Sequence, residues 1–169
     1  LGIKFTPKVN GYITGVRYYK SEANTGTHIG NLWTLTGINL ARATFINETA
    51  SGWQEVAFGN PVQVTAGTTY VASYHTSTGH YYQNYNAFGS ALDTYYLTVP
   101  ADGTNGPNGV YSYSAGTAFP TTGYQASNYW VDVVFNTDIG PDITPPVIVN
   151  VTPSENASGV QITIHPTVT

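Results

Sequence analysis

The sequence predicts an all-β fold, an antiparallel β-sandwich of jelly-roll type. Short runs of β-branched and aromatic residues follow one another along the chain, separated by clusters of Gly, Asn, Pro and Ser. No stretch shows helical periodicity. Strands at this spacing are typical of sandwiches, and one long loop-rich excursion fits the longer crossovers of a jelly roll. A closed barrel is the alternative.

The clearest strand signal lies near residue 130. In the segment 129–135 (YWVDVVF) every second residue, starting at Tyr129, is bulky and apolar. This period of two predicts one face toward the core. The opposite face, which carries Trp130 and Asp132, is expected to point outward or to lie beneath a loop.

A second long strand is predicted over 11–20 (GYITGVRYYK). Val16 and Tyr18 share one face of it, whereas Ile13 is out of phase with them. We therefore expect a β-bulge near Gly15. A polar loop is expected at 21–30. Shorter strands are predicted at 3–5, 31–35, 40–46, 53–58, 62–64, 69–75, 95–99 and 110–113, with Trp53 as a core anchor at the start of its strand.

The chain changes character in its middle and again near its end. Residues 76–123 are rich in Gly, Asn, Ser and Tyr, which predicts a functional surface or a set of short edge strands. Three prolines, a glycine and two aspartates between 136 and 146 cannot continue a strand. We expect a β-sandwich module at 1–136, a Pro-rich linker at 137–146 and part of a second domain at 147–169, with strands at 147–151 and 160–164.

Composition argues against several classes of partner. Asp, Glu, Lys and Arg make up 8% of the chain, far below the roughly 25% of an average domain. Five basic residues are too few for a stripe that follows a phosphate backbone, and the net charge is −4, so nucleic acid is not an expected partner. No apolar run is long enough for membrane insertion, and the absence of Cys excludes disulfides and thiolate metal sites.

No constellation typical of catalysis is visible. Glycoside hydrolysis needs two carboxylates that flank one cleft, and of the nine acidic residues only Asp132 lies on a firmly predicted strand. The sequence has no Gly-x-Ser-x-Gly elbow for an activated serine. His75 and His80 alone would make a weak metal pair and are expected to be solvated or hydrogen-bonded loop histidines. We therefore expect a protein without catalytic activity.

The loop 102–109 (DGTNGPNG) is a candidate calcium site. Asp and Asn side chains and backbone carbonyls are the oxygen ligands that Ca²⁺ uses. However, Asp-Gly and Asn-Gly are also the commonest dipeptides of tight turns, and only one carboxylate is present. No cofactor other than a structural Ca²⁺ is expected, and its candidate ligands are Asp102, Asn105 and Asn108.

Aromatic residues are the most informative feature. They make up 14% of the chain and include 14 Tyr. Sugar rings present apolar C–H faces that stack on Tyr and Trp, and hydroxyls that pair with amides and imidazoles. Two segments, 74–85 and 111–129, supply both kinds of group, although Tyr also packs well on any pleated sheet. The candidate sugar-binding residues are Trp33, Tyr74, His75, His80, Tyr81, Tyr82, Tyr85, Tyr113, Tyr124 and Asn128.

Several motifs in fixed order resemble a bacterial family known as domain of unknown function 4082. The resemblance spans about residues 2–136. It implies a secreted β-sandwich that occurs in large multidomain surface proteins and beside polysaccharide-acting enzymes, with no established activity and no catalytic residues. The motifs are GYITGVRYYK (11–20), TGTH (25–28), GNLW (30–33), ATF (43–45), SGWQ (51–54), Pro61, AGTTYVASYH (66–75), GVY (109–111) and NYWVDV (128–133).

The end of the chain resembles the start of a bacterial immunoglobulin-like domain of the surface-layer type. The motifs are TPP (144–146), VTP (151–153) and GV (159–160). This resemblance implies a spacer in a tandem array of domains.

Together these observations predict a non-catalytic carbohydrate-binding module of a secreted or cell-surface bacterial protein. Its expected partners are a polysaccharide and the neighbouring domains of the same chain. The alternative is a structural or adhesive spacer with no glycan ligand, which the linker and the immunoglobulin-like start favour.

Overall fold

The computed structural model describes residues 1–140, 151–152 and 167–168. The chain divides into two compact units, Leu1–Ile139 and Gly140–Thr169. In the second unit, β12 (Val151–Thr152) pairs antiparallel with β13 (Thr167–Val168). The strand predicted at 160–164 lies outside the described residues.

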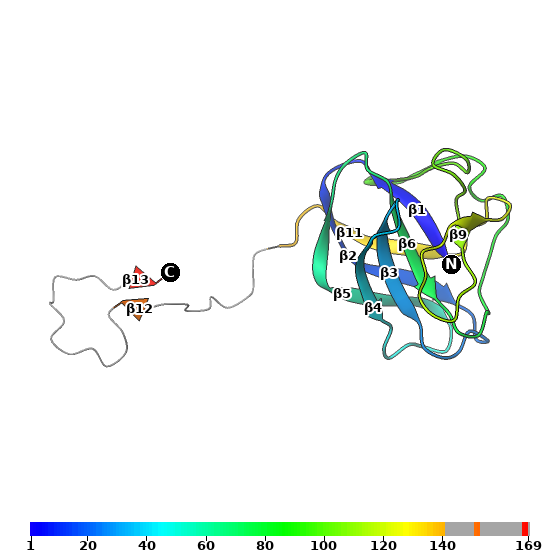
Figure 1. Cartoon of the computed structure of the whole chain (residues 1–169), viewed down its shortest axis with the longest axis horizontal. Helices are drawn as coiled ribbons and strands as arrows, with labels where there is room; N and C mark the ends of the chain where they lie inside the picture. Colours follow the sequence, from blue (N-terminus) through cyan, green and yellow to red (C-terminus); the bar gives the residue numbers. More distant parts are fainter. Residues whose placement is uncertain (141–150, 153–166, 169) are drawn as a thin grey trace. The chain divides into compact units, whose positions relative to one another are not determined.

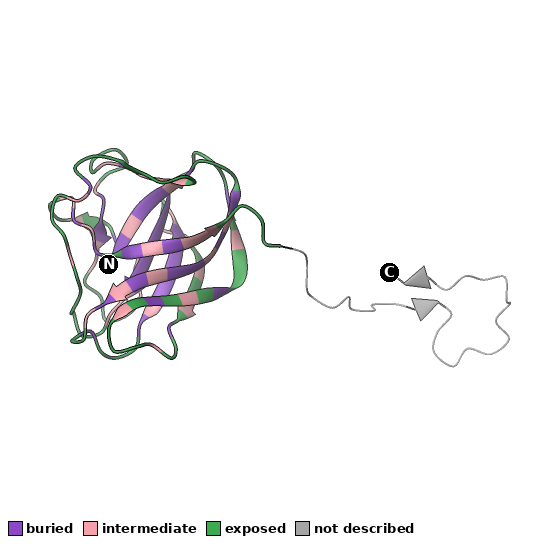
Figure 2. Cartoon of the chain, turned by 180° about the vertical axis from the view of Figure 1, so that it is seen from behind, coloured by how far each residue is buried: buried purple, intermediate pink, exposed green. Residues whose placement is uncertain are grey.

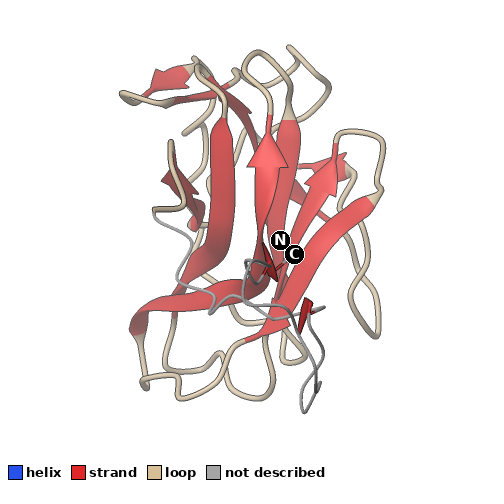
Figure 3. Ribbon diagram, turned by 90° about the vertical axis from the view of Figure 1, so that its left-hand side faces the viewer, coloured by secondary structure: helices blue, strands red, loops and turns tan. Residues whose placement is uncertain are grey.

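The first unit consists of strands joined by loops (Figure 3), with no helix among its residues, all of which are described. No helix of the described residues is long and apolar enough to span a bilayer. The strands are β1 (Gly2–Pro7), β2 (Gly11–Lys20), β3 (Ile29–Thr34), β4 (Asn39–Thr44), β5 (Gly52–Val64), β6 (Tyr70–His75), β7 (Leu92–Asp93), β8 (Leu97–Val99), β9 (Val110–Tyr111), β10 (Thr122–Gly123) and β11 (Val131–Asn136).

These strands form two antiparallel sheets that pack against one another (Figure 1). The larger sheet has the order β10-β9-β1-β6-β3-β4, and β8 adds to β1 and pairs with β7. The smaller sheet has the order β11-β2-β5. The predicted all-β sandwich is therefore confirmed, with two separate sheets instead of a closed barrel.

The core lies between the sheets and follows the predicted alternation. In β2, Ile13, Val16 and Tyr18 are fully buried, and they meet Phe5 of β1 and Leu32 of β3 from the other sheet. Burial of each such side chain contributes about 1.5–3 kcal/mol to stability. Figure 2 shows that buried residues gather on the strands, whereas the connecting loops are mostly exposed.

Two local predictions in the smaller sheet are confirmed. The pairing of β2 with β5 shifts between Ile13 and Gly15, where the bulge was expected. Strand β11 buries Val131 and Val133 and pairs antiparallel with β2. Trp130, just before β11, faces outward and is 37% exposed.

Strand β5 differs from the prediction. The sequence predicted two strands, at 53–58 and 62–64, but β5 is one strand of 13 residues. It lies at the edge of its sheet, where Pro61 can be accommodated without a ladder hydrogen bond. The prediction that Trp53 anchors the core is wrong, because its side chain is 47% exposed.

The long excursion 76–123 contains only short strands. β7, β8 and β9 have two or three residues each, and β10 begins at its end. The chain there runs mainly as loops, and two of these loops, together with β9, build the site described next.

Candidate functional site

Two tyrosine-rich loops, 76–86 and 112–128, lie side by side close to β9. The backbones of Asn84 and Asn128 exchange two hydrogen bonds, of 3.0 and 2.9 Å. A third bond runs from the N–H of Asn86 to the carbonyl of Gln125, at 2.8 Å. The two segments that the sequence offered separately therefore form one surface.

The segment 81–85 (YYQNY) sends alternate side chains to opposite sides. Tyr81, Gln83 and Tyr85 line one hollow. Tyr82 and Asn84 instead meet aromatic rings of the smaller sheet. An extended backbone produces this separation, because successive side chains point in opposite directions.

The first side of the segment forms an open groove, hereafter the tyrosine groove, of about 240 Å³. Its rings meet edge to face: Tyr85 and Tyr124 have centroids 6.0 Å apart, and Tyr111 and Tyr113 have centroids 5.5 Å apart. Such pairs hold one another in place and leave their outer faces free. The groove is lined by Tyr81, Gln83, Tyr85, Tyr111, Tyr113, Tyr124 and Tyr129.

The rim of the groove is well exposed. Tyr113 is 90% exposed, Tyr85 is 52% and Tyr124 is 51%, whereas Tyr129 is buried beneath them. Burial raises the pKa of Tyr129 to about 12 and moves the pKa of Tyr81 in the same direction. These two hydroxyls are therefore protonated at neutral pH and can donate hydrogen bonds.

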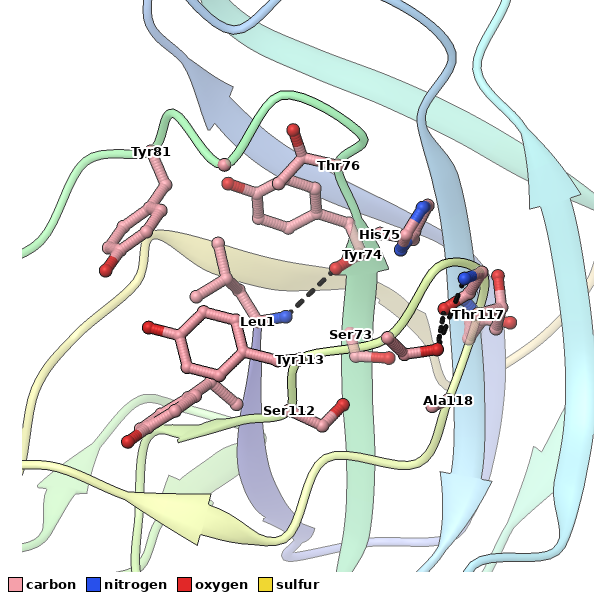
Figure 4. Close-up of a pocket in the computed structure, with 15 residues that line it drawn as sticks. Leu1, Ser73, Tyr74, His75, Thr76, Tyr81, Ser112, Tyr113, Thr117 and Ala118 are labelled. Carbon is pink, nitrogen blue, oxygen red and sulfur yellow. Dashed lines mark hydrogen bonds between the residues drawn. The ribbon is translucent and has the colours of Figure 1, made fainter.

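A second hollow, of about 190 Å³, adjoins the groove and shares Tyr81, Tyr111 and Tyr113 with it. Figure 4 shows Tyr81 and Tyr113 on one side of it, and Ser73, Thr117 and Ala118 on the other. Its lining is rich in hydroxyls, and His75 adds an imidazole whose pKa is lowered by burial. Aromatic faces and small hydrogen-bonding groups thus border one continuous surface.

Two residues expected to bind sugar need a correction. Tyr74 borders the second hollow, but it is 1% exposed and its ring stacks on Tyr18 in the core, with centroids 4.1 Å apart. Trp33 is 7% exposed, and its Nε1 donates to Oγ of Ser73 at 2.8 Å. Tyr74 faces the core between the sheets, whereas Trp33 lies on the opposite face of the larger sheet, packed with Val71, Val110 and Phe119.

The remaining candidates fall outside the groove lining. His80 is exposed on the 76–86 loop. Asn128 has a supporting role, because its Oδ1 accepts the backbone N–H of Trp130 at 2.8 Å. Tyr82 contacts Tyr19 on the other side of the loop, with centroids 5.3 Å apart.

Sequence reasoning missed three groove residues, Gln83, Tyr111 and Tyr129. A signal for two of them was present, since Gln83 lies between Tyr81 and Tyr85 at a spacing of two, and Tyr111 precedes Tyr113 by two. Tyr129 was predicted to face the core, and it does so while forming the floor of the groove.

The oxygens of the candidate calcium loop are engaged by protein groups. The ammonium of Lys4 donates to the carbonyl of Asn105 at 2.6 Å. Oδ1 of Asn108 accepts the N–H of Lys4, and its Nδ2 donates to the carbonyls of Lys4 and Pro100. Oδ1 of Asp102 accepts the N–H of Asn108 at 2.8 Å. The loop is thereby fastened to β1, and the described part of the chain contains no cluster of three His, Asp or Glu residues that could hold a metal ion.

Comparison with known proteins agrees with the motifs found in the sequence. Residues 1–131 match the family model described as a domain of unknown function, DUF4082. No curated protein and no solved structure matches the chain. The matched stretch includes both tyrosine-rich loops and every residue of the tyrosine groove. The chain belongs to the DUF4082 family.

Proposed function

We propose that this chain is a non-catalytic carbohydrate-binding module of a secreted or cell-surface bacterial multidomain protein. The observation that carries this proposal is the tyrosine groove, in which six tyrosines and a glutamine surround one open hollow beside a hydroxyl-rich one. The ligand is a segment of polysaccharide.

The groove offers the two interactions that a sugar ring needs. Tyr113 and Tyr85 expose flat apolar faces on which C–H groups can stack. Gln83 in the groove, and His75 and Ser112 in the adjoining hollow, offer hydrogen bonds to sugar hydroxyls. Binding by apolar contact and neutral hydrogen bonds depends little on salt.

The charge of the site favours an uncharged ligand and argues against catalysis. None of the residues that line the two hollows, all in the described part of the chain, is Asp, Glu, Lys or Arg. A glycosidase would need two carboxylates there. An anionic polysaccharide would find no Lys or Arg side chain in the lining of these two hollows.

Affinity electrophoresis and a glycan array test this function. We expect wild-type protein to bind at least one neutral polysaccharide. We expect Tyr85→Ala and Tyr113→Ala each to weaken binding by about tenfold, which corresponds to about 1.4 kcal/mol. Tyr95→Ala is the matched control, because Tyr95 is 85% exposed but lies outside both hollows.

The outcomes separate the function from the site. Failure of the wild-type protein to bind any polysaccharide would overturn the proposed function. Retention of full affinity in Tyr85→Ala and Tyr113→Ala would overturn the assignment of the groove. Equal losses in the Tyr95→Ala control would show that exposed tyrosines act without regard to place.

The second unit favours an alternative, a structural or adhesive spacer without a glycan ligand. The antiparallel pair β12–β13 supports this alternative, together with the resemblance of 144–160 to the start of an immunoglobulin-like domain. The domains encoded beside this one in the parent gene distinguish a carbohydrate-binding module from a spacer. A neighbouring glycosidase or lyase domain supports a carbohydrate-binding module, and long tandem repeats with a surface anchor support a spacer.

A further inference from the structure

The outer face of the smaller sheet carries a second group of exposed aromatic rings, hereafter the aromatic platform. Tyr19 of β2 pairs directly with Trp53 of β5, and the N–H of Tyr19 donates to the carbonyl of Trp130 at 3.0 Å. The centroid of the Tyr19 ring lies 5.6 Å from that of Trp53 and 6.1 Å from that of Trp130. Tyr82 adds a fourth ring from the 76–86 loop, 5.3 Å from Tyr19.

The platform is exposed and yet held in place. Trp53 is 47% exposed, Tyr82 is 46% and Trp130 is 37%. Nε1 of Trp130 donates to Oδ1 of Asn84 at 2.6 Å, and its backbone N–H donates to Oδ1 of Asn128 at 2.8 Å. Rings fixed before a ligand arrives lose little conformational freedom when it binds.

The backbone of Trp130 has a φ of 55°, in the left-handed region. A bulky residue rarely adopts this region, which costs about 1–3 kcal/mol and persists only where surrounding contacts impose it. The contacts with Asn84 and Asn128 do so here. This backbone conformation places the indole of Trp130 at the surface, where it is 37% exposed.

A charged row lies beside the platform on the same face of the sheet. Arg17 pairs with Glu55 on one side and with Asp132 on the other, so the three residues cross β5, β2 and β11 in line. This row is two residues along the strands from the aromatic row, a separation of about 7 Å. Nε and Nη2 of Arg17 donate to Oδ2 of Asp132 at 3.0 and 2.5 Å, and Cζ of Arg17 lies 5.3 Å from the centre of the Trp53 ring.

The charged row borders an open hollow of about 320 Å³. Arg17, Glu55 and Asp132 line it together with Tyr96 and Phe135. The face therefore continues from exposed aromatic rings to hydrogen-bonding groups. The separation of 7 Å is about the width of one pyranose ring and its hydroxyls.

We infer that this face is a second carbohydrate site, which binds a neutral polysaccharide chain lying across the three strands. A pyranose ring of that chain stacks on the exposed indole of Trp53, which stands perpendicular to the Tyr19 ring, and hydroxyls of the chain donate to the carboxylates of Glu55 and Asp132. Two carboxylates against one guanidinium make the row net negative, so uronate, sulfate and phosphate groups are repelled. The inference rests on the proposed function, but not on the tyrosine groove.

The alternation of the 81–85 segment keeps the two sites experimentally separate. Tyr85 belongs to the groove and Tyr82 to the platform. Trp53 and Glu55 lie on β5 and line neither groove nor adjoining hollow. Substitution of Trp53 or Glu55 therefore leaves the lining of the groove unchanged, and substitution of Tyr85 or Tyr113 leaves the platform unchanged.

The test is a titration of the protein with soluble polysaccharides, in which binding is measured by calorimetry and by tryptophan fluorescence. The neutral probes are arabinoxylan, galactomannan and hydroxyethyl cellulose, and the anionic probes are polygalacturonate and alginate. We expect a neutral probe to shift the emission of exposed Trp53 and Trp130. We expect Trp53→Ala to reduce affinity at least tenfold, Glu55→Gln to reduce it several-fold, and the double variant Tyr85→Ala/Tyr113→Ala to retain the fluorescence shift.

Other results would overturn the inference in distinguishable ways. Full affinity and an unchanged fluorescence shift in Trp53→Ala and in Tyr82→Ala, with loss in the groove variants, would remove the platform and leave the proposed function intact. No response of the wild-type protein to any probe would remove both. Tighter binding of the anionic probes would contradict the ligand class.

Self-association that Trp53→Ala abolishes, without glycan binding, would show an interface between copies of the chain. Tyr82→Ala and Glu55→Gln, both at exposed positions, keep the test decisive where Trp53→Ala lowers stability.

Discussion

The ammonium nitrogen of Lys20 lies 2.5 Å from Oε2 of Glu48, and each side chain is only 11% exposed. The same carboxylate accepts a hydrogen bond from the hydroxyl of Tyr18 at 3.1 Å. It also lies 2.9 Å from Nδ1 of His28, a residue with no exposed surface. A buried carboxylate is tolerated when its oxygens are so fully engaged. Glu48, in the loop after β4, thereby connects β2 with the loop before β3, which carries His28.

Removal of the Glu48 carboxylate should therefore destabilise the sandwich. We expect Glu48→Ala to lower the free energy of unfolding by about 3 kcal/mol, because the charge of Lys20 is left buried and unpaired. Glu22→Ala, at an exposed position of the 21–30 loop, should change it by less than about 0.5 kcal/mol. Urea denaturation measures both values. Equal stabilities of the two variants would show that the cluster contributes nothing.

The same cluster predicts how stability depends on pH. Burial lowers the pKa of His28, and this effect outweighs the opposing influence of Glu48. Burial alone would raise the pKa of Glu48, but hydrogen bonds from Lys20 and His28 hold it below the ordinary range. Both groups thus take up protons more readily in the unfolded chain, so the free energy of unfolding decreases as the pH falls.

The decrease should begin near pH 6.5, the pKa of an unfolded histidine, and should steepen below about pH 4.3, that of an unfolded glutamate. Above about pH 7 stability should be flat with respect to these groups. Urea denaturation of the wild type and of His28→Gln between pH 4 and 8 checks this. The variant should lose part of the slope near pH 6, and His75, whose pKa burial also lowers, should contribute a further part. An identical slope in His28→Gln would contradict the assignment.

Calcium removal should leave the thermal midpoint unchanged. Lys4 already places its ammonium on the carbonyl of Asn105, and Asp102 and Asn108 are engaged within the loop and with β1. A cation arriving there would have to displace Lys4, with repulsion between like charges. Differential scanning calorimetry in chelator and in millimolar CaCl₂ gives the comparison. A higher midpoint with calcium would restore the loop as a metal site.

The sequence correctly predicted the features that depend on a strict alternation of inward-facing and outward-facing side chains. The period of two in 129–135 placed Val131 and Val133 in the core and Trp130 at the surface, and the structure agrees. The same rule would have placed Trp53 outside, because the alternating residues Gln54 and Phe58 of β5 are buried. The expectation failed because it rested on the position of Trp53 at the start of its strand and not on the period.

A buried Gln54 is acceptable only because a neighbouring turn satisfies its amide. Its Nε2 donates to Oγ1 of Thr49 at 2.6 Å and to the carbonyl of Gly52 at 3.0 Å, and its Oε1 accepts the N–H of Thr49 at 2.8 Å. Hydropathy gives no sign of this arrangement, since it depends on the path of the chain before β5. The aromatic platform was missed for that reason.

The division of the 81–85 segment between two surfaces also depends on distant residues. Asn84 is paired with Asn128, which is distant in the sequence, and contacts of this kind decide which side chains of the loop face the groove. The period of two places Tyr81, Gln83 and Tyr85 on one side of the segment, but it does not show which residues each side contacts. The aromatic content of the loops was predictable, and their partners were not.

A close approach of two backbone segments beneath the groove gives a last prediction. A Cβ at Gly109, which directly precedes β9, would overlap the carbonyl oxygen of Ser127 and lie 3.1 Å from Cδ2 of Tyr129. The backbone of Ser127 is fixed by the adjacent loop contacts, so the added methyl group must force the segments apart. We expect Gly109→Ala to cost about 1–3 kcal/mol and to weaken glycan binding, since Tyr111 and Tyr129 would shift.

Gly59→Ala is the matched control. Gly59 lies on the exposed edge strand β5, and a Cβ there would meet no atom within 4 Å. The free energy of unfolding should stay the same or rise by up to about 1 kcal/mol, because alanine restricts the unfolded chain. Urea denaturation and affinity electrophoresis of the two variants provide the measurement. If Gly109→Ala were as stable as Gly59→Ala and bound glycan equally well, the contact between Gly109 and Ser127 would not define the groove floor.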